Sequence, residues 1–195
     1  QDSIYAETNH MFIKTFFDVI AKDLCNLHVI YLRRDILDTL CSFVSLKYFS
    51  PENKSWPKWM ISPNAVTSAM KCLDQDENLD YIDLSIAYLI DIEARANRFA
   101  IDYPEIPLTN IKIKDLNNHF FVRNLFSKVG IKYTCATESL IGKRINQRNE
   151  VKSSFNNSLD RDYLKDRITI YLSKIQKAGL RLPNISGSEG FNFKE

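Results

Sequence analysis

The sequence predicts an α/β fold of three layers, in which a mostly parallel sheet is flanked by helices on both sides. The run His28–Leu32 is rich in Val, Ile, Tyr and Leu, the composition of a strand that is buried on both faces. A shorter apolar run at Ile4–Glu7 precedes it, and apolar residues at helical spacing over Met11–Leu24 lie between the two runs. This order indicates a β–α–β unit, because a crossover helix is the usual connection between parallel strands.

The rest of the chain is predicted to be mostly helical, with breakers at the ends of its elements. Tyr103-Pro104 ends the longest helical pattern, and Gly130 follows another in the manner of a C-terminal glycine cap. We expect the acidic residues of the longest pattern to lie away from its apolar face, which is traced by Leu84, Tyr88, Ile92, Ala96 and Phe99. The remaining expected elements are a loop over Tyr48–Pro63, helices over Val66–Leu73 and Leu79–Ile101, a strand over Asn110–Lys114, and helices over Leu116–Val129 and Asp160–Ala178.

The length of the chain predicts one domain. A chain of 195 residues can bury a full hydrophobic core by itself. We expect this domain to cover residues 1–182 and to be followed by a flexible tail over residues 183–195.

A polar helix start directly follows the strand at His28–Leu32. Arg34 closes the strand, Asp35 has the character of an N-cap, and Asp38 stands in the first turn, where a carboxylate can reach free backbone N–H groups. At the carboxyl end of a parallel strand, a helix start carries partial positive charge that suits an anion. Ser42 lies about two turns into the helix, so Arg34 and Ser42 could hold one phosphate together. The alternative is a solvated arginine and a serine without a special role.

The segment RRDILDTLCSF resembles the 3′-phosphate-binding segment of the sulfotransferase superfamily, whose co-substrate is 3′-phosphoadenosine 5′-phosphosulfate. In that family a strand ends in Arg, and an Asp and then a Ser follow at a spacing that Arg34, Asp38 and Ser42 match. The flanking segments IYAETNH and DIEARANRFAIDYPEIPLTNIKIKDL are similar to the family's preceding strand and to its following helix, Tyr-Pro turn and strand. The resemblance covers Ile4 to Ile131 in order.

The resemblance implies a P-loop NTPase-like sulfotransferase fold with a helix-rich C-terminal half. It also implies that a sulfuryl group is transferred from the co-substrate to a hydroxyl or amine of a small molecule or glycan, without a metal. Arg34 and Ser42 would bind the 3′-phosphate of the co-substrate. His10, at the turn after the first strand, would be the catalytic base, with Glu7 as the alternative. A histidine at such a turn can also be a simple helix cap, and Ile113 replaces the family's adenine-stacking aromatic residue.

The glycine-containing loop that grips the 5′-phosphosulfate in this family has no counterpart in the sequence, whose first glycine is Gly130. We therefore expect a sulfotransferase fold that is incomplete at its N-terminus. Two hypotheses remain: a sulfotransferase that is active when such a loop is supplied, and a catalytically inactive nucleotide-binding or interaction module on the same scaffold. A nucleotide-kinase-like phosphotransferase is a third, less favoured hypothesis, because the sequence has neither a Walker lysine nor a strand-end Asp suited to magnesium.

Two loops offer further candidate binding residues, each with a structural alternative. Trp56 and Trp59 could form an apolar wall for the acceptor or could anchor their loop to the core. A later basic loop could add donors to the 3′-phosphate site or could be solvated surface; its residues are Gly142, Lys143, Arg144 and Arg148.

Charge and composition exclude several other classes of protein. A net charge of +2 argues against a nucleic-acid-binding protein, and no apolar run approaches the roughly 18 residues that span a membrane. The four cysteines lie far apart without metal-ligand spacing, so we expect reduced thiols and no metal site. This favours the cytoplasm, with the Golgi lumen as the alternative, and the sequence does not indicate an oligomeric state.

Overall fold

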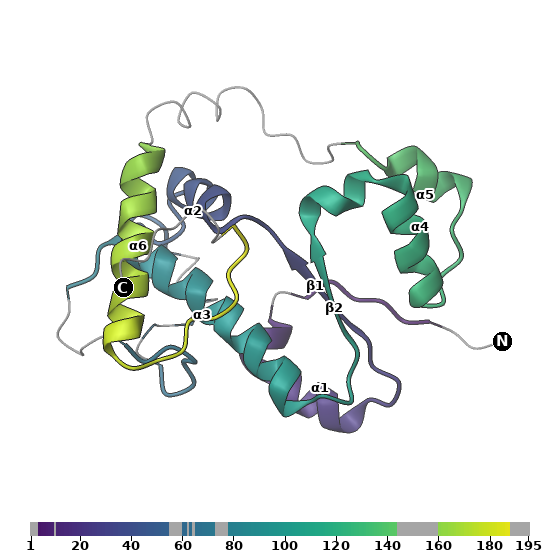
Figure 1. Cartoon of the computed structure of the whole chain (residues 1–195), viewed down its shortest axis with the longest axis horizontal. Helices are drawn as coiled ribbons and strands as arrows, with labels where there is room; N and C mark the ends of the chain where they lie inside the picture. The colour runs from purple at the N-terminus through teal and green to yellow at the C-terminus, as the bar shows by residue number, and fades with distance from the viewer. Residues whose placement is uncertain are drawn as a thin grey trace. The chain divides into compact units, whose positions relative to one another are not determined.

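The structure is a computed structural model of the chain and describes residues 4–9, 11–54, 60–61, 63, 65–72, 78–143 and 160–187. The chain divides into two compact units. The first consists of Gln1–Arg34 and Asp102–Gln147, and the second of Asp35–Ile101 and Arg148–Glu195. The α/β class is confirmed, and the described residues form one sheet of two parallel strands among their helices (Figure 1).

The first unit contains the sheet. Strand β1 (Val29–Arg33) pairs in parallel with β2 (Leu108–Lys112), in a register that sets Val29 opposite Leu108 and Arg33 opposite Lys112. The strand expected at His28–Leu32 is therefore confirmed with a shift of one residue, whereas β2 begins and ends two residues before the expected Asn110–Lys114. The earlier end of β2 follows from Asp115, whose carboxylate accepts the Lys112 N–H (3.2 Å) and starts a 3-10 turn.

The segment expected as the first strand lies outside this sheet. Residues 4–9 are extended and exposed, and within the described part of the chain they pair with neither β1 nor β2. The expectation of a strand at Ile4–Glu7 is therefore not met here. Within this segment the Glu7 side chain accepts hydrogen bonds from the side chains of Tyr5 and Asn9.

Helices in the first unit follow the expected order. The helix predicted over Met11–Leu24 is a π-helical turn followed by an α-helix, and the one predicted over Leu116–Val129 begins after a 3-10 turn. Gly130 has a φ of 72°, which confirms its role as a C-terminal cap. One short helix, α5, was not predicted. The bounds are η1 (Phe12–Phe16), α1 (Phe17–Asp23), η3 (Ile113–Asn117), α4 (His119–Lys128) and α5 (Cys135–Leu140).

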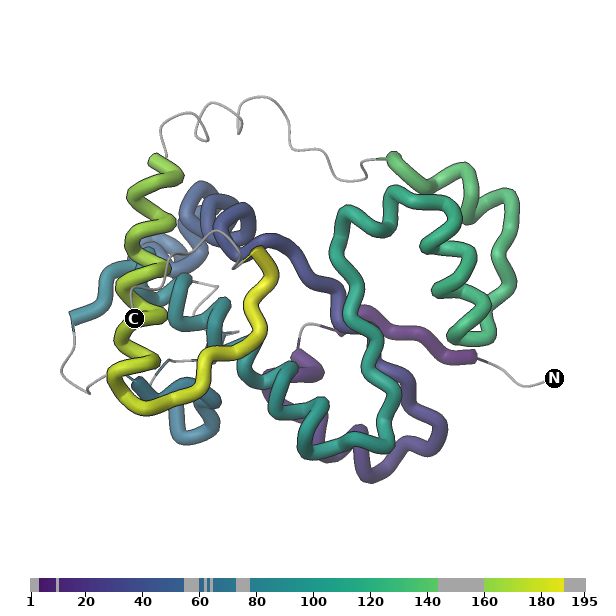
Figure 2. The backbone as a smooth tube through the Cα atoms, in the orientation of Figure 1, coloured from purple at the N-terminus to yellow at the C-terminus, as the bar shows by residue number. Residues whose placement is uncertain are grey.

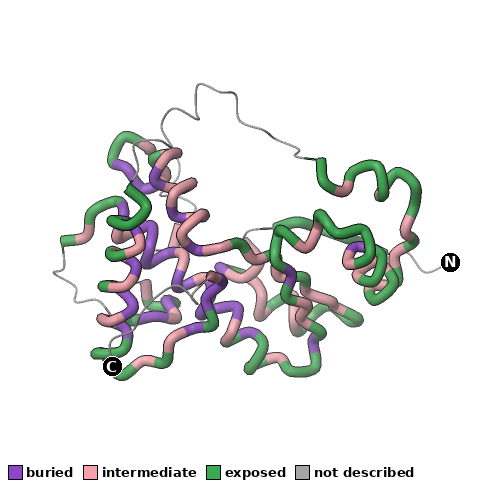
Figure 3. Tube along the Cα trace, turned by 45° about the horizontal axis from the view of Figure 1, so that its top comes forward, coloured by how far each residue is buried: buried purple, intermediate pink, exposed green. Residues whose placement is uncertain are grey.

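The second unit is built on three helices that share one core: α2 (Ile36–Ser45), α3 (Tyr81–Asp102) and α6 (Arg161–Lys177). α3 and α6 confirm predicted helices within two residues, and α2 begins directly after Asp35, as predicted. Buried residues recur along the helical part of the trace (Figure 3), and the core includes Leu40, Ile86, Ile90, Leu164, Ile168 and Leu172, each fully buried. Burial of these apolar side chains is the main stabilising term of the unit.

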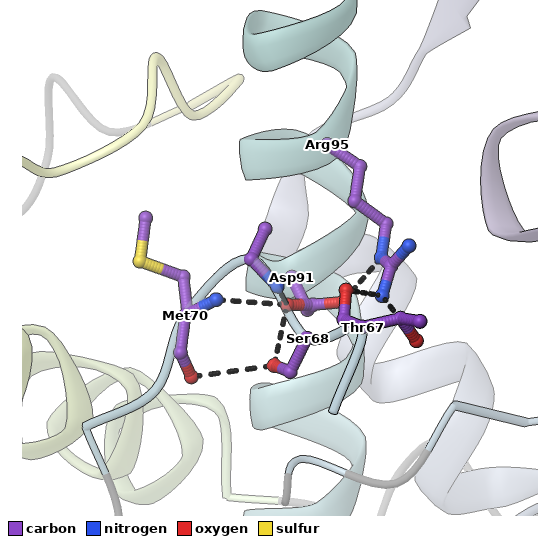
Figure 4. Close-up of polar contacts among 6 residues, drawn as sticks. Thr67, Ser68, Met70, Asp91 and Arg95 are labelled. Atoms are coloured by element: carbon purple, nitrogen blue, oxygen red, sulfur yellow. Dashed lines mark hydrogen bonds and ion pairs between the residues drawn. The ribbon is translucent and has the colours of Figure 1, made fainter. Parts of the chain in front are cut away.

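A buried carboxylate on α3 corrects two expectations. Asp91 is 2% exposed, and Glu93 is buried as well, so the acids of α3 do not all lie away from its apolar face. Asp91 Oδ1 accepts hydrogen bonds from Ser68 Oγ (2.8 Å), the Ala69 N–H (2.6 Å) and the Met70 N–H (3.0 Å), as Figure 4 shows for the Ser68 and Met70 contacts. Because these N–H groups bind a side chain, they cannot donate along a helix, and the predicted helix over Val66–Leu73 is wrong for the described residues 65–72.

Arg95 completes this buried network from the next turn of α3. Its Nε donates to Asp91 Oδ2 (2.6 Å), and its Nη2 donates to the Thr67 carbonyl (Figure 4). The ion pair therefore attaches the segment around residues 67–70 to α3 without leaving the Asp91 carboxylate uncompensated.

The chain after α6 also packs, contrary to the expected tail. Pro183, Ile185 and Ser186 are buried, and Ile185 belongs to the helical core. The chain turns at Gly179 and runs back along the helices, so that its described end lies beside the start of α2 (Figure 2). The packed region therefore extends beyond residue 182, to Gly187.

We predict that Asp91→Ala lowers the free energy of unfolding by about 3–5 kcal/mol, because it leaves a buried guanidinium without its counter-charge. The double variant Asp91→Leu/Arg95→Met should recover only the part of this loss that comes from the uncompensated charge, because the Ala69 and Met70 N–H groups still lack the acceptor that Asp91 provides. Urea unfolding followed by circular dichroism measures both effects. Asp166→Ala on the exposed side of α6 is the control, with an expected change within about 0.5 kcal/mol. A loss of less than about 1 kcal/mol for Asp91→Ala would contradict the prediction.

Candidate functional site

The start of α2 is formed as the sequence predicts. Asp35 is its N-cap: the carboxylate oxygen Oδ1 accepts the Asp38 N–H (2.9 Å), and the Asp35 carbonyl accepts the Thr39 N–H (3.0 Å). Ile36, Leu40 and Val44 form the buried face of the helix, which fixes its orientation within the second unit. The polar start is therefore held from two sides, by its cap and by its apolar face.

Two backbone donors of this helix start are engaged by groups outside the helix ladder. The Ile36 N–H donates to the Ser186 carbonyl (3.0 Å), and the Asp38 N–H donates to the Asp35 cap. Backbone N–H groups at a helix start are what an anion would bind. An anion at α2 therefore competes with a carbonyl oxygen and a carboxylate of the same chain.

Asp38 does not reach back to the backbone as its position suggested. Its carboxylate instead accepts a hydrogen bond from Arg161 Nη2 (2.9 Å) at the start of α6, and Arg161 Nη1 lies 3.6 Å from Cys41 Sγ. This hydrogen bond from the guanidinium raises the pKa of Arg161 above its ordinary value. Arg161 was not predicted to belong to this site. A cation in the first turn of a helix interacts unfavourably with the helix dipole, so its position could have indicated that an acidic side chain compensates it.

The predicted phosphate pair divides between the two units. Arg34 is exposed and is the last residue of the first unit's N-terminal segment, whereas Ser42 is half-buried on α2 in the second unit. Their convergence on one phosphate stays a prediction from the spacing of the motif.

Cations gather at the carboxyl end of the two strands. The register sets Arg33 of β1 opposite Lys112 of β2, Arg34 follows β1 directly, and Lys114 follows β2. Arg34, Lys112 and Lys114 are all exposed. We call these three residues the cationic edge, and its charge suits a small anion carrying more than one phosphate.

Of the two candidates for the catalytic base, only Glu7 is among the described residues. His10 lies outside the described residues. Glu7 is exposed, and its two carboxylate oxygens accept hydrogen bonds from Tyr5 Oη (3.0 Å) and Asn9 Nδ2 (2.7 Å). The base therefore stays a prediction, with both residues as candidates.

The two additional loops are described only in part. Trp56, Trp59, Arg144 and Arg148 lie outside the described residues. Lys143 is exposed, and Gly142 has a φ of 78°, a conformation that suits glycine. The role of the basic loop stays a prediction.

Comparisons with protein-family models, with curated proteins and with solved structures find no match to the chain. The likeness to sulfotransferases therefore depends on the motifs of this sequence and on the order of its elements.

Metal and membrane sites are absent from the part of the chain that the structure describes. No three His, Cys, Asp or Glu residues there come together as ligands for a metal ion. None of the helices in that part has the length and apolar composition needed to cross a bilayer.

The four cysteines are unpaired with one another and differ in exposure: Cys25 and Cys135 are exposed, and Cys41 and Cys72 are half-buried. Burial raises the pKa of the thiols of Cys41 and Cys72 above the usual value of 9.0. Since the thiolate is the reactive form, both thiols are poor nucleophiles near neutral pH.

We predict that a thiol reagent at pH 7.5 labels Cys25 and Cys135 at least about tenfold faster than Cys41 and Cys72, as followed by peptide mass spectrometry. The rates for the slow pair should rise as the pH is raised above 9.0, because their raised pKa delays formation of the thiolate. Unfolded protein is the control, and there all four sites should react alike. Fast labelling of Cys41 in the folded protein would contradict the prediction, because it would mean that the reagent reaches this half-buried thiol freely.

Proposed function

We propose that this chain is a sulfotransferase-type nucleotide-binding protein, which binds the 3′-phosphate of 3′-phosphoadenosine 5′-phosphosulfate through Arg34 and Ser42. The observation that carries the proposal is the parallel strand β1, which runs directly into an Asp35-capped helix and ends beside a second parallel strand. This is the arrangement in which α/β proteins bind phosphate-containing ligands, at the carboxyl ends of parallel strands.

The proposed fold is the three-layer, mostly parallel sheet of the sulfotransferases. Two features of the first unit support it. A two-stranded sheet is marginal alone, and parallel sheets are normally covered on both faces. Ile30 and Leu32 of β1 nevertheless remain 46% and 49% exposed, so one face of this strand is open to a further covering layer.

The cationic edge supports a phosphorylated nucleotide as the ligand. A guanidinium offers two parallel donors to a phosphate, and lysines add positive charge without a fixed geometry. Arg34, Lys112 and Lys114 lie in one unit, so this charge does not depend on how the two units are arranged. Arg34 is the residue that we expect to discriminate a 3′-phosphate, because it is the one that matches the motif.

In the active form of the proposal, the protein moves a sulfuryl group to an acceptor hydroxyl or amine. The acceptor oxygen or nitrogen forms a new bond to sulfur and gives its proton to the base, His10 or Glu7. The bond from sulfur to the phosphate oxygen breaks, and adenosine 3′,5′-bisphosphate leaves. Such a transfer depends mainly on positioning and on stabilisation of charge.

A second function is an inactive nucleotide-binding or interaction module on the same scaffold. A loop that grips the 5′-phosphosulfate through backbone N–H groups needs glycine, and residues 1–129 contain none. Both functions retain the 3′-phosphate site, so nucleotide binding tests what they share. We propose the cytoplasm as the compartment, because the described cysteines are free thiols, with the Golgi lumen as the alternative.

We predict that Arg34→Ala weakens binding of adenosine 3′,5′-bisphosphate by about tenfold to a hundredfold, the range expected when a charge-assisted hydrogen bond worth about 1.5–3 kcal/mol is lost. Isothermal titration calorimetry measures the affinity. Binding of adenosine 5′-monophosphate, which has no 3′-phosphate, should not change. The exposed Arg181→Ala is the matched control, since it removes one arginine elsewhere. Equal affinities of the wild type and Arg34→Ala for the bisphosphate would overturn the proposed site.

We predict for the active form that the chain releases adenosine 3′,5′-bisphosphate from 3′-phosphoadenosine 5′-phosphosulfate when a hydroxyl acceptor is added. Chromatography of the nucleotides measures this release. His10→Ala should abolish it if histidine is the base, and Glu7→Gln should do so if the carboxylate is the base. Nucleotide binding without release would instead identify the inactive module.

A further inference from the structure

Three polar side chains come together in the first unit, where the two strands begin. His28 directly precedes β1, Thr109 is the second residue of β2, and Lys128 is the last residue of α4. Thr109 Oγ1 lies 2.8 Å from His28 Nε2 and accepts a hydrogen bond from Lys128 Nζ (3.3 Å). We call these three residues the hydroxyl cluster. All of them belong to one unit, so their arrangement does not depend on the second unit.

The contacts of the hydroxyl cluster give its members different chemical abilities. An ammonium group has donors and no acceptor, so of the two partners only the imidazole nitrogen can accept the Thr109 proton. A hydroxyl within hydrogen-bond reach of an imidazole is the arrangement in which a general base activates a nucleophile. Lys128 places a positive charge at the same oxygen, where it can stabilise negative charge that develops during a reaction.

A cavity of about 430 Å³ lies beside the hydroxyl cluster, and His28 is part of its wall. The segments that lead into β1 and β2 form much of this wall, and both lie at the same end of the sheet (Figure 1). Thr109 follows the lining residue Pro107 by two positions. His28 and Thr109 are half-buried and therefore not sealed from solvent. The volume is within the range of small-molecule sites, roughly 300–1,000 Å³.

The wall of the cavity indicates which ligand it suits. It is apolar except at His28, Asn26 and Glu105. Leu24 is 55% exposed there, so an apolar group in the cavity would remove apolar surface from water. The carboxylate of Glu105 repels an anion, so the group that enters is neutral or cationic. Its apolar residues are Ala21, Leu24, Leu27, Ile106 and Pro107.

We propose that the hydroxyl cluster is a catalytic site that hydrolyses neutral carboxylic esters with a short apolar group. Thr109 is the nucleophile, His28 is the general base, and the cavity binds the apolar group. This inference does not rest on the proposed nucleotide site, because Arg34 follows the other end of β1, about 20 Å from His28 at about 3.3 Å per residue. An ester in the cavity is therefore not the acceptor of the proposed sulfuryl transfer.

The reaction has two halves, and each returns its proton. In the first, Thr109 Oγ1 bonds to the carbonyl carbon, and its proton passes to His28 Nε2. The bond from this carbon to the alcohol oxygen then breaks, and His28 gives the proton to the leaving alcohol. In the second, water attacks the acyl group on Thr109 and gives a proton to His28, which returns it to Thr109 Oγ1 as the carboxylic acid leaves. Lys128 stabilises the negative carbonyl oxygen in both halves.

Hydrolysis of p-nitrophenyl butyrate by the full chain tests the proposal. We expect saturable release of p-nitrophenol and a fall in kcat/KM of about 100-fold or more in both Thr109→Val and His28→Gln, as for the loss of general-base catalysis. Thr109→Ser should stay within about tenfold of the wild type, because it keeps the hydroxyl. His119→Gln is the matched control, since His119 is the other described histidine, is exposed and belongs to the same unit.

Two further variants test the roles of Lys128 and of the cavity. Lys128→Met should lower kcat by about tenfold with little change in KM, because the ammonium acts on charge that exists in the transition state. Leu24→Asp should raise KM, because it sets a carboxylate against the apolar group of the ester. Val19→Asp is the matched control: Val19 is 53% exposed on α1 and does not line the cavity, so KM should not change.

A covalent probe distinguishes catalysis from a hydrogen bond that merely joins the two strands. An alkyl fluorophosphonate reacts with an activated hydroxyl, loses fluoride and leaves a stable phosphonate ester on the attacking oxygen. Peptide mass spectrometry should find this group on Thr109 of the wild type and of His119→Gln, and not on Thr109 of His28→Gln. A structural hydrogen bond alone would not make Thr109 react faster than other threonines.

The outcomes decide the proposal in either direction. It is overturned if the wild type hydrolyses the ester no faster than unfolded protein at the same concentration, or if Thr109→Val keeps the wild-type kcat/KM. If circular dichroism shows that Thr109→Val or His28→Gln does not fold, the probe on the wild type decides. A phosphonate on Thr109 then supports the catalytic site, and its absence from Thr109 overturns it.

Discussion

The second unit depends on the carboxylate of Asp35, where the beginning and the described end of its chain meet. One oxygen of this carboxylate caps α2 (2.9 Å to the Asp38 N–H), and the other lies against Gly187. The adjacent Ile36 N–H is bonded to Ser186 (3.0 Å), so the helix start is fixed by residues from both ends of the unit. The buried face of α2, which fixes the orientation of the helix, meets α6.

Elements whose boundary signals are local could be predicted from the sequence. Asp35 and Asp160 begin α2 and α6, and Gly130 and Gly179 follow α4 and α6 with positive φ, because caps and glycine turns act within a few residues. The long periodic pattern of α3 was predicted for a similar reason, since it repeats over six turns.

Features that depend on residues distant in the chain could not be predicted. The segment at Val66 has a helical composition, but its N–H groups bind Asp91, more than 20 residues later. Composition likewise marked Pro183 as the start of a tail, whereas Ile185 finds a hydrophobic pocket between helices that the sequence does not reveal. In both cases tertiary contacts override the local preference of the chain.

The candidate site likewise combines features that local sequence signals predict with contacts to distant residues that they do not predict. The charges of these residues also show why a phosphate there needs a cation from another element. The capped start of α2 could be predicted, but its partners Arg161 and Ser186, more than 100 residues away, could not. With these partners the cluster has two acids, Asp35 and Asp38, and one base, so by itself it disfavours a dianion. A phosphate bound there needs a cation from outside the cluster, and Arg34 is the residue that precedes Asp35 in the chain. Under the proposed function, Arg34 supplies this positive charge and Ser42 of α2 supplies a neutral hydroxyl donor.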